Sequence, residues 1–170
     1  MPIYNKLSEI RIKIRNEDFI LSFIIKIFKL LIYIQQKYNY INLDVKLQNI
    51  MYDLKKKDIV LIDFSLILTN SNNKVYIPVK KYKQLPNIVC SLEKIPIYSV
   101  YVCIVDLLFE NNKKLYNYDF NKIISLLFYK KYSFFFINLL DKIKNMHNMI
   151  DLIEDINYYK NKNVNKWYKN

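Results

Sequence analysis

Hydrophobic residues recur at helical spacing over residues 5 to 38, and the most apolar stretch runs from Phe19 to Ile34. That stretch is 16 residues long and is interrupted by two lysines. A membrane-spanning helix needs about 20 predominantly apolar residues, so the pattern predicts a buried core helix and no membrane span. Asn16 precedes two acidic residues and is the expected N-cap. The helix is predicted to end near Gln36.

Over Tyr40–Phe64 the pattern changes from a helical to a strand-like period. Two β-prone runs, Asn49–Tyr52 and Ile59–Ile62, are separated by the polar residues 53 to 58. This arrangement predicts a β-hairpin. Residues 65 to 95 contain prolines and a cluster of asparagines, so we expect them to be irregular.

Helical periodicity returns at Ile97 and continues almost to the end of the chain. The last residues are rich in asparagine and lysine and are expected to fray. The pattern predicts a single domain that is mainly α with a small β-hairpin. The predicted helices are Tyr98–Phe109, Phe120–Tyr129, Phe134–Lys144 and Met149–Tyr159.

Composition narrows the possible chemistry of this domain. The chain has no glycine, which excludes the dinucleotide-binding fingerprint, the Walker phosphate loop and the nucleophile elbow. A single histidine, His147, and two cysteines cannot supply a four-ligand zinc site of the His/Cys type. Cys90 and Cys103 are therefore expected to be buried thiols in a reducing compartment. The abundance of Lys, Asn, Ile and Tyr is typical of an AT-rich genome, such as that of a large DNA virus or an intracellular parasite.

The formal net charge is +12, but the lysines are scattered from Lys6 to Lys169 rather than gathered into a strip. We therefore interpret them as a solvated surface, which disfavours nucleic acid as a partner. The first residues contain no cleavable apolar segment, so we expect an intracellular, cytoplasmic protein without a signal peptide.

Four polar residues in and after the predicted hairpin form a set suited to phosphoryl transfer. Asn42-Leu43-Asp44-Val45-Lys46-Leu47-Gln48-Asn49 precedes the hairpin, and Ile62-Asp63-Phe64-Ser65 ends it. Such a site needs a carboxylate at the attacking hydroxyl, a cation for the moving phosphoryl group, and oxygen ligands for magnesium. The residues that match these needs are Asp44, Lys46, Asn49 and Asp63.

These segments resemble the catalytic loop H-R-D-x-x-x-x-N and the metal-binding motif D-F-G of the eukaryotic-type protein kinases. The resemblance implies ATP and Mg²⁺ as cofactors and a fold like the large, C-terminal lobe of a kinase. Asp44 would be the catalytic base, and Lys46 would contact the γ-phosphate. Asn49 and Asp63 would bind the metal. A lysine two positions after the aspartate is similar to the serine/threonine-directed branch.

The resemblance covers nearly the whole chain as one lobe, without the small N-terminal lobe that covers ATP in the family. It divides residues 1–170 into a catalytic loop (42–49), a metal motif (63–65), an activation-like segment (65–93) and a helical subdomain (97–160).

Several positions depart from the family pattern. Asn42-Leu43 replaces His-Arg, and Ser65 replaces the glycine after Asp-Phe. Leu85-Pro86-Asn87 stands where the family has Ala-Pro-Glu, and Pro96 stands where it has an aspartate. With these supports lost, we expect a degenerate lobe that is inactive alone.

Two functions stay open. The first is a truncated serine/threonine protein kinase that transfers the γ-phosphate of ATP to a protein substrate, with a separately encoded N-lobe as one candidate partner. The second is a non-catalytic, pseudokinase-type module that binds a protein through the exposed inter-lobe face. A small-molecule phosphotransferase is a third reading, which Lys46 disfavours.

Overall fold

The computed structural model describes residues 4–7, 16–53, 55–64, 67–69, 94–109 and 120–167. Within these ranges the chain is mainly helical, with short antiparallel strands. The elements are β1 (Tyr4–Lys6), α1 (Glu17–Tyr38), β2 (Tyr40–Asn42), the short 3₁₀ helix η3 (Leu47–Asn49), β3 (Ile50–Asp53), β4 (Asp58–Leu61), β5 (Ile67–Thr69), α2 (Ile95–Phe109), α3 (Phe120–Tyr129), α4 (Phe134–Lys144) and α5 (Met149–Trp167).

Helix α1 has the start that the sequence predicts. The Oδ1 atom of Asn16 accepts a hydrogen bond from the Phe19 N–H at 2.8 Å, so Asn16 is the N-cap. The helix ends at Tyr38, two residues beyond the predicted end, because Asn39 adopts a left-handed conformation with φ 55° and donates its N–H to the Gln35 carbonyl. Asparagine tolerates this conformation better than most residues, which allows a sharp turn into β2.

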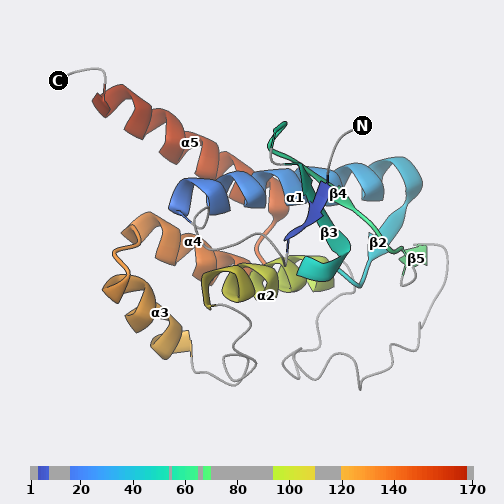
Figure 1. Cartoon of the computed structure of the whole chain (residues 1–170), viewed down its shortest axis with the longest axis horizontal. Helices are drawn as coiled ribbons and strands as arrows, with labels where there is room; N and C mark the ends of the chain where they lie inside the picture. The colour runs from blue at the N-terminus through green and yellow to red at the C-terminus, as the bar shows by residue number, and fades with distance from the viewer. Residues whose placement is uncertain are drawn as a thin grey trace.

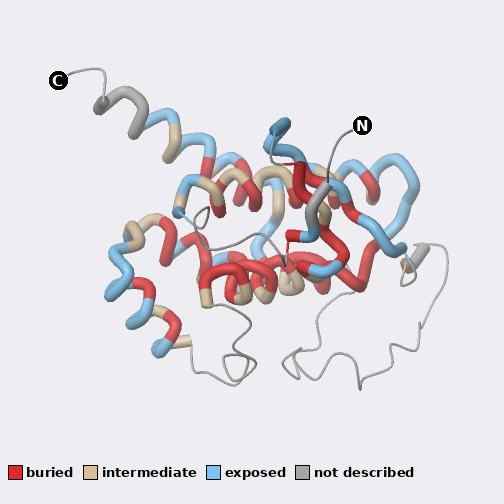
Figure 2. Tube along the Cα trace, in the orientation of Figure 1, coloured by how far each residue is buried: buried red, intermediate tan, exposed pale blue. Residues whose placement is uncertain are grey.

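Helix α1 is the buried core helix that the sequence predicts. Its apolar face packs against α2, α5 and the strands, and the aromatic rings of Phe23 and Phe28 are completely enclosed. Figures 1 and 2 show α1 lying across the molecule, with its buried residues facing α2 and the β3–β4 hairpin. Within the described ranges, no helix is both long and apolar enough to cross a membrane.

The predicted hairpin is confirmed as β3 and β4, which pair antiparallel. The turn between them is held by Asp53, whose Oδ1 accepts the backbone N–H groups of Lys55 and Lys56 at 2.9 and 3.1 Å. These bonds favour the charged carboxylate and lower the pKa of Asp53. Lys57 closes the turn with φ 53°, where glycine is the usual residue.

Short strands were missed by the sequence pattern. Residues 4–6 form β1 on the edge of β3, although residues 5 and 6 were predicted as helical, and β5 lies in the region predicted to be irregular. A strand of three residues is too short to reveal a period, and these strands are defined by their partners. The predicted end of the last helix at Tyr159 was also wrong, since α5 continues to Trp167, and residues 168–170 lie outside the described residues. Residues 70–93, most of the activation-like segment, lie outside the described residues.

Glu17, in the first turn of α1, links three helices. Its carboxylate accepts the Ser133 N–H at 2.8 Å, the Ser133 hydroxyl at 2.5 Å and the Tyr159 hydroxyl at 3.4 Å. Ser133 is itself the N-cap of α4, since its Oγ accepts the Phe136 N–H at 3.1 Å. One carboxylate therefore connects the start of α1 to the start of α4 and to α5.

We predict that Glu17→Ala lowers the free energy of unfolding by about 1–3 kcal/mol, because the donors of Ser133 lose their charged acceptor. Asp18→Ala is the matched control, since Asp18 lies in the same helical turn but is exposed. The Asp18→Ala protein should lose only the helix-dipole contribution of Asp18, which is about 0.3–1 kcal/mol of unfolding free energy. Urea denaturation followed by circular dichroism measures both values, and equal losses would contradict the linking role of Glu17.

Candidate functional site

The loop between β2 and η3 is held by alternating apolar residues. Leu43, Val45 and Leu47 are all buried, and Val45 and Leu47 belong to the main hydrophobic core. Asp44 and Lys46 occupy the positions between them. Because the apolar side chains are anchored in the protein interior, the backbone of the loop is restrained and the two charged residues are carried on a fixed support.

Asp44, Lys46 and Asn49 are in direct contact. The Lys46 Nζ donates to Asp44 Oδ2 at 2.6 Å, and the Asn49 Nδ2 donates to the same oxygen and to the Asp44 carbonyl, both at 3.0 Å. Asp44 is only 7% exposed, whereas the side chain of Lys46 is partly open to solvent. The loop thus fixes a carboxylate beside a cation that can still reach an anionic ligand.

Asn42 also belongs to this cluster, which sequence reasoning missed. Its Oδ1 accepts the backbone N–H of Asp44 at 2.8 Å, in the local turn that asparagine side chains commonly make. The Asn42 side chain is buried, and its Nδ2 has no hydrogen-bond partner among the described residues. The spacing Asn-x-Asp was the available signal, but it was interpreted only as a departure from the family's histidine.

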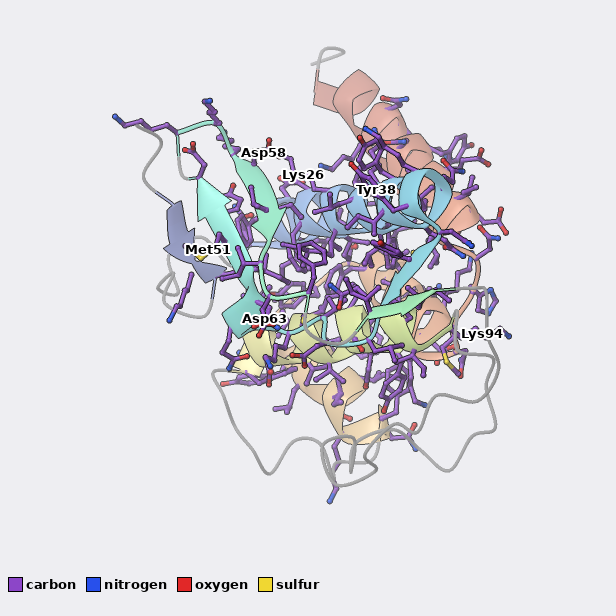
Figure 3. All side chains as sticks on the ribbon, turned by 90° about the vertical axis from the view of Figure 1, so that its right-hand side faces the viewer. Lys26, Tyr38, Met51, Asp58, Asp63 and Lys94 are labelled. Carbon is purple, nitrogen blue, oxygen red and sulfur yellow. The ribbon has the colours of Figure 1, made fainter. Side chains whose placement is uncertain are left out.

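Asp63 reaches the same region from the end of the hairpin. The N–H of Ile62 donates to the Asn49 carbonyl at 2.8 Å, which ties the segment leaving β4 to η3. Figure 3 shows Asp63 beside η3. Asp63 is exposed and has φ 62°, a left-handed conformation that aspartate adopts more readily than most residues. Ser65, the last residue of the predicted metal motif, lies outside the described residues.

Helix α2 supports the loop from beneath. The Cys103 Sγ lies 3.8 Å from the Val45 carbonyl and donates a weak hydrogen bond to it. Cys103 is buried, as predicted, and burial raises the pKa of its thiol well above the usual range. Cys90 lies outside the described residues.

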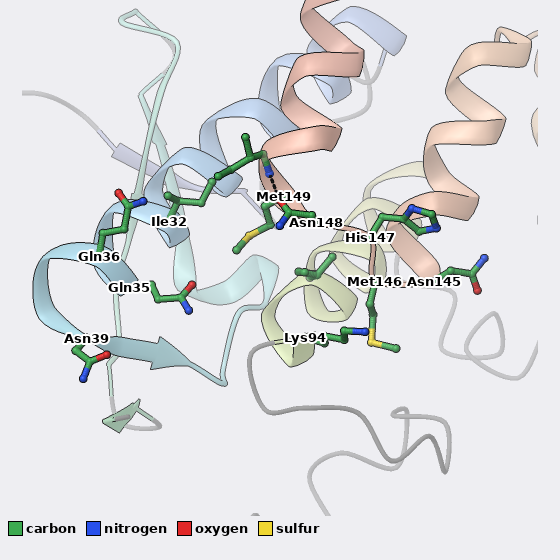
Figure 4. Close-up of a pocket in the computed structure, with 12 residues that line it drawn as sticks. Ile32, Gln35, Gln36, Asn39, Lys94, Asn145, Met146, His147, Asn148 and Met149 are labelled. Atoms are coloured by element: carbon green, nitrogen blue, oxygen red, sulfur yellow. Dashed lines mark hydrogen bonds between the residues drawn. The ribbon is translucent and has the colours of Figure 1, made fainter. Parts of the chain in front are cut away.

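A separate pocket lies at the C-terminal end of α1. It has a volume of about 800 Å³ and lies among the last turns of α1, the start of α2 and the α4–α5 connection. Figure 4 shows Gln35, Lys94 and Met149 around it. His147 is one of the lining residues and is exposed, as the sequence predicted for a residue at a helix boundary. The four predicted site residues do not line this pocket, so it is distinct from the Asp44 cluster.

The oxygen atoms near Asp44 suit a hard cation. Both hydrogen bonds of the Asn49 amide to Asp44 start from Nδ2, so its Oδ1 is the atom able to bind a metal. The Asp63 carboxylate is the second oxygen group expected to bind metal, and Mg²⁺ is commonly held by few carboxylate or amide oxygens plus substrate phosphates. No three His, Cys, Asp or Glu side chains in the described ranges are placed to hold a metal.

Comparison with known proteins does not identify a family. A scan against protein-family models and a search of the curated proteins both returned no match. The functional interpretation is therefore built from the loop, the hairpin and the residues that they carry.

We predict that Cys103 reacts with a thiol reagent at least about tenfold more slowly in the native protein than in urea, because the thiolate is the reactive form and burial suppresses it. The measurement uses a Cys90→Ser background, so that Cys103 is the only thiol. A control protein with Cys90→Ser, Cys103→Ala and Ser125→Cys places the thiol on the exposed face of α3 and should react equally fast in both states. Fast native labelling of Cys103 would show that α2 does not pack beneath the loop as described.

Proposed function

We propose that this chain is the large-lobe part of a protein-kinase-like phosphotransferase, directed to serine or threonine hydroxyls of a protein substrate. The observation that carries the proposal is the bonded cluster of Asp44, Lys46 and Asn49 on a buried loop. The hydrogen bond from Ile62 to Asn49 brings the segment that bears Asp63 to the same loop. A carboxylate, a cation and two metal-binding groups are the components that phosphoryl transfer requires.

Each side chain has a distinct role in this proposal. Asp44 orients the substrate hydroxyl and accepts its proton, and the bonds from Lys46 and Asn49 to Asp44 Oδ2 hold the carboxylate in one orientation. Lys46 turns from Asp44 toward the transferred phosphoryl group and offsets its negative charge. Asn49 and Asp63 hold Mg²⁺ against the nucleotide. ATP supplies the phosphoryl group, and Mg²⁺ neutralises charge on its phosphates.

A covering lobe would complete this site. In this proposal, the described residues supply ligands for the phosphate end of a nucleotide. The eukaryotic-type protein kinases, which the chain resembles, bind ATP between two lobes. Catalysis under this proposal depends on a second lobe supplied as a partner. Nucleotide binding through the metal is the property that the large lobe can show by itself.

We predict that the protein binds ATP in a Mg²⁺-dependent manner and that Asp63→Asn weakens this binding by at least about tenfold, as loss of a metal-site interaction commonly does. Asparagine retains the tolerance for positive φ, so the hairpin should keep its shape. Asp58→Asn is the matched control because Asp58 is an exposed acid at the far end of β4. Isothermal titration calorimetry with and without Mg²⁺ measures the effect. Unchanged affinity in Asp63→Asn would sink the proposed nucleotide site.

A second candidate function is a non-catalytic module that binds a protein through the outer face of the β3–β4 hairpin. Strand β4 alternates, with Ile59 and Leu61 buried and Val60 more than a third exposed. Ile62 and Phe64 continue the exposed apolar series beyond the strand. The solvent-facing side of an antiparallel sheet normally carries polar residues. Because this hairpin has apolar residues on both sides, we expect a partner to cover its outer side.

We predict that the native protein binds a hydrophobic fluorescent dye and that Val60→Ser combined with Ile62→Ser lowers the signal in proportion to the apolar area removed, at least about twofold more than one exposed substitution elsewhere. Ile150→Ser is the control, since this residue is exposed on α5. Sedimentation velocity should show less self-association for the double variant. A monomer that does not bind the dye would count against the interaction module and leave the nucleotide test unaffected.

A further inference from the structure

Three aromatic side chains project from the corner where α3 meets α4. Phe128 is 49% exposed, Tyr129 is 85% exposed and Phe134 is 68% exposed. The rings of Phe128 and Phe134 lie side by side, with their centroids 6.1 Å apart. We refer to these three residues as the aromatic corner. Isolated exposed aromatics are common on protein surfaces, but a contiguous group of them usually marks an interaction surface.

Packing of α3 does not require the aromatic corner. The buried residues of α3 are Ile123 and Leu127, which face the core, whereas Phe128 and Tyr129 face away from it. Figures 1 and 2 show the α3–α4 connection at the outer edge of the molecule, where the trace is largely exposed. The rings therefore project from an edge and do not line the pocket at the end of α1.

Positive charge surrounds the aromatic corner. Lys130 and Lys131 form the turn between the helices, and both are exposed. Residues 120–136 contain no aspartate or glutamate. The carboxylate of Glu17 is near this turn, and its oxygens are occupied by hydrogen bonds from Ser133, the residue before Phe134. The Nζ of Lys130 donates to the Leu108 carbonyl at 3.1 Å, so Lys131 is the lysine of this turn that extends outward with least constraint.

We propose that the aromatic corner docks onto the surface of an anionic lipid bilayer. Aromatic rings beside lysines suit the bilayer interface, because the rings enter the boundary between headgroups and acyl chains while the lysines pair with anionic headgroups. The net charge of +12 adds a long-range attraction to the same surface. The proposal is independent of the phosphotransfer site.

The test is co-sedimentation of the full chain with vesicles of phosphatidylcholine, with or without about 30% phosphatidylserine, at low and at physiological salt. We expect binding to the anionic vesicles that weakens with salt. Combining Phe128→Ser with Phe134→Ser should reduce the partition coefficient by at least about tenfold, because the inserted apolar area is lost. Combining Lys130→Gln with Lys131→Gln should also reduce the partition coefficient. The expected reduction is about fivefold for each lysine that faces the lipid.

Two further variants keep this test decisive. Tyr129→Ser changes a side chain that is 85% exposed, so it should reduce binding without affecting the fold even if the double variant is unstable. Combining Tyr33→Ser with Tyr38→Ser removes two exposed rings at the end of α1 and should leave binding within about twofold of the original. Equal binding by the original protein and the Tyr129→Ser protein would overturn the proposal. If the aromatic corner causes self-association and the protein does not bind vesicles, the lipid proposal is overturned, and the partner of the corner is a second copy of the chain.

Discussion

The burial of Val45 and Leu47 in the core formed by α1 and α2 is the constraint on which the polar loop depends. Two apolar anchors on alternate residues leave the intervening Lys46 at the boundary with solvent, and they hold the backbone on either side of it. Cys103 adds a contact from α2 to the Val45 carbonyl. The hydrogen bonds among Asp44, Lys46 and Asn49 can then form between side chains whose backbone is already ordered, which reduces the entropy lost in making them.

The absence of glycine shapes the turns around this core. Left-handed conformations cost an ordinary residue roughly 1–2 kcal/mol, and glycine usually occupies such positions. Among the described residues, the non-glycine positions with positive φ are Asn39, Lys57, Asp63, Lys131 and Met146. Asn39 and Asp63 stand on either side of the polar loop and hairpin, and their side chains tolerate this conformation best.

The proposed functions use different surfaces of one scaffold. In the proposed phosphotransferase, the cluster around Asp44 would supply the charged half of the site, and the apolar outer face of β4 lies next to the segment that carries Asp63. A partner covering that face would exclude water near the cluster and strengthen its electrostatic interactions. The same covering interaction would serve a non-catalytic module equally well, so Mg²⁺ binding by Asn49 and Asp63 is the property that would separate the two proposed functions. The aromatic corner belongs to α3 and α4, which leaves it available while the hairpin face is occupied.

Local signals in the sequence were sufficient for much of the fold. The cap at Asn16, the hairpin around Asp53 and the bounds of α3 and α4 follow from side-chain capping, turn chemistry and hydrophobic period, which act over a few residues. The four candidate site residues were proposed from residue type and spacing, and the structure brings three of them, Asp44, Lys46 and Asn49, into contact. Tertiary structure alone decided the pairing of β1 with β3 and of β2 with β5, the contact of Cys103 with the Val45 carbonyl, and the part played by Asn42. Strand pairing and burial depend on which distant segments meet in the folded chain, and a strand of three residues carries no period from which its partner could be inferred.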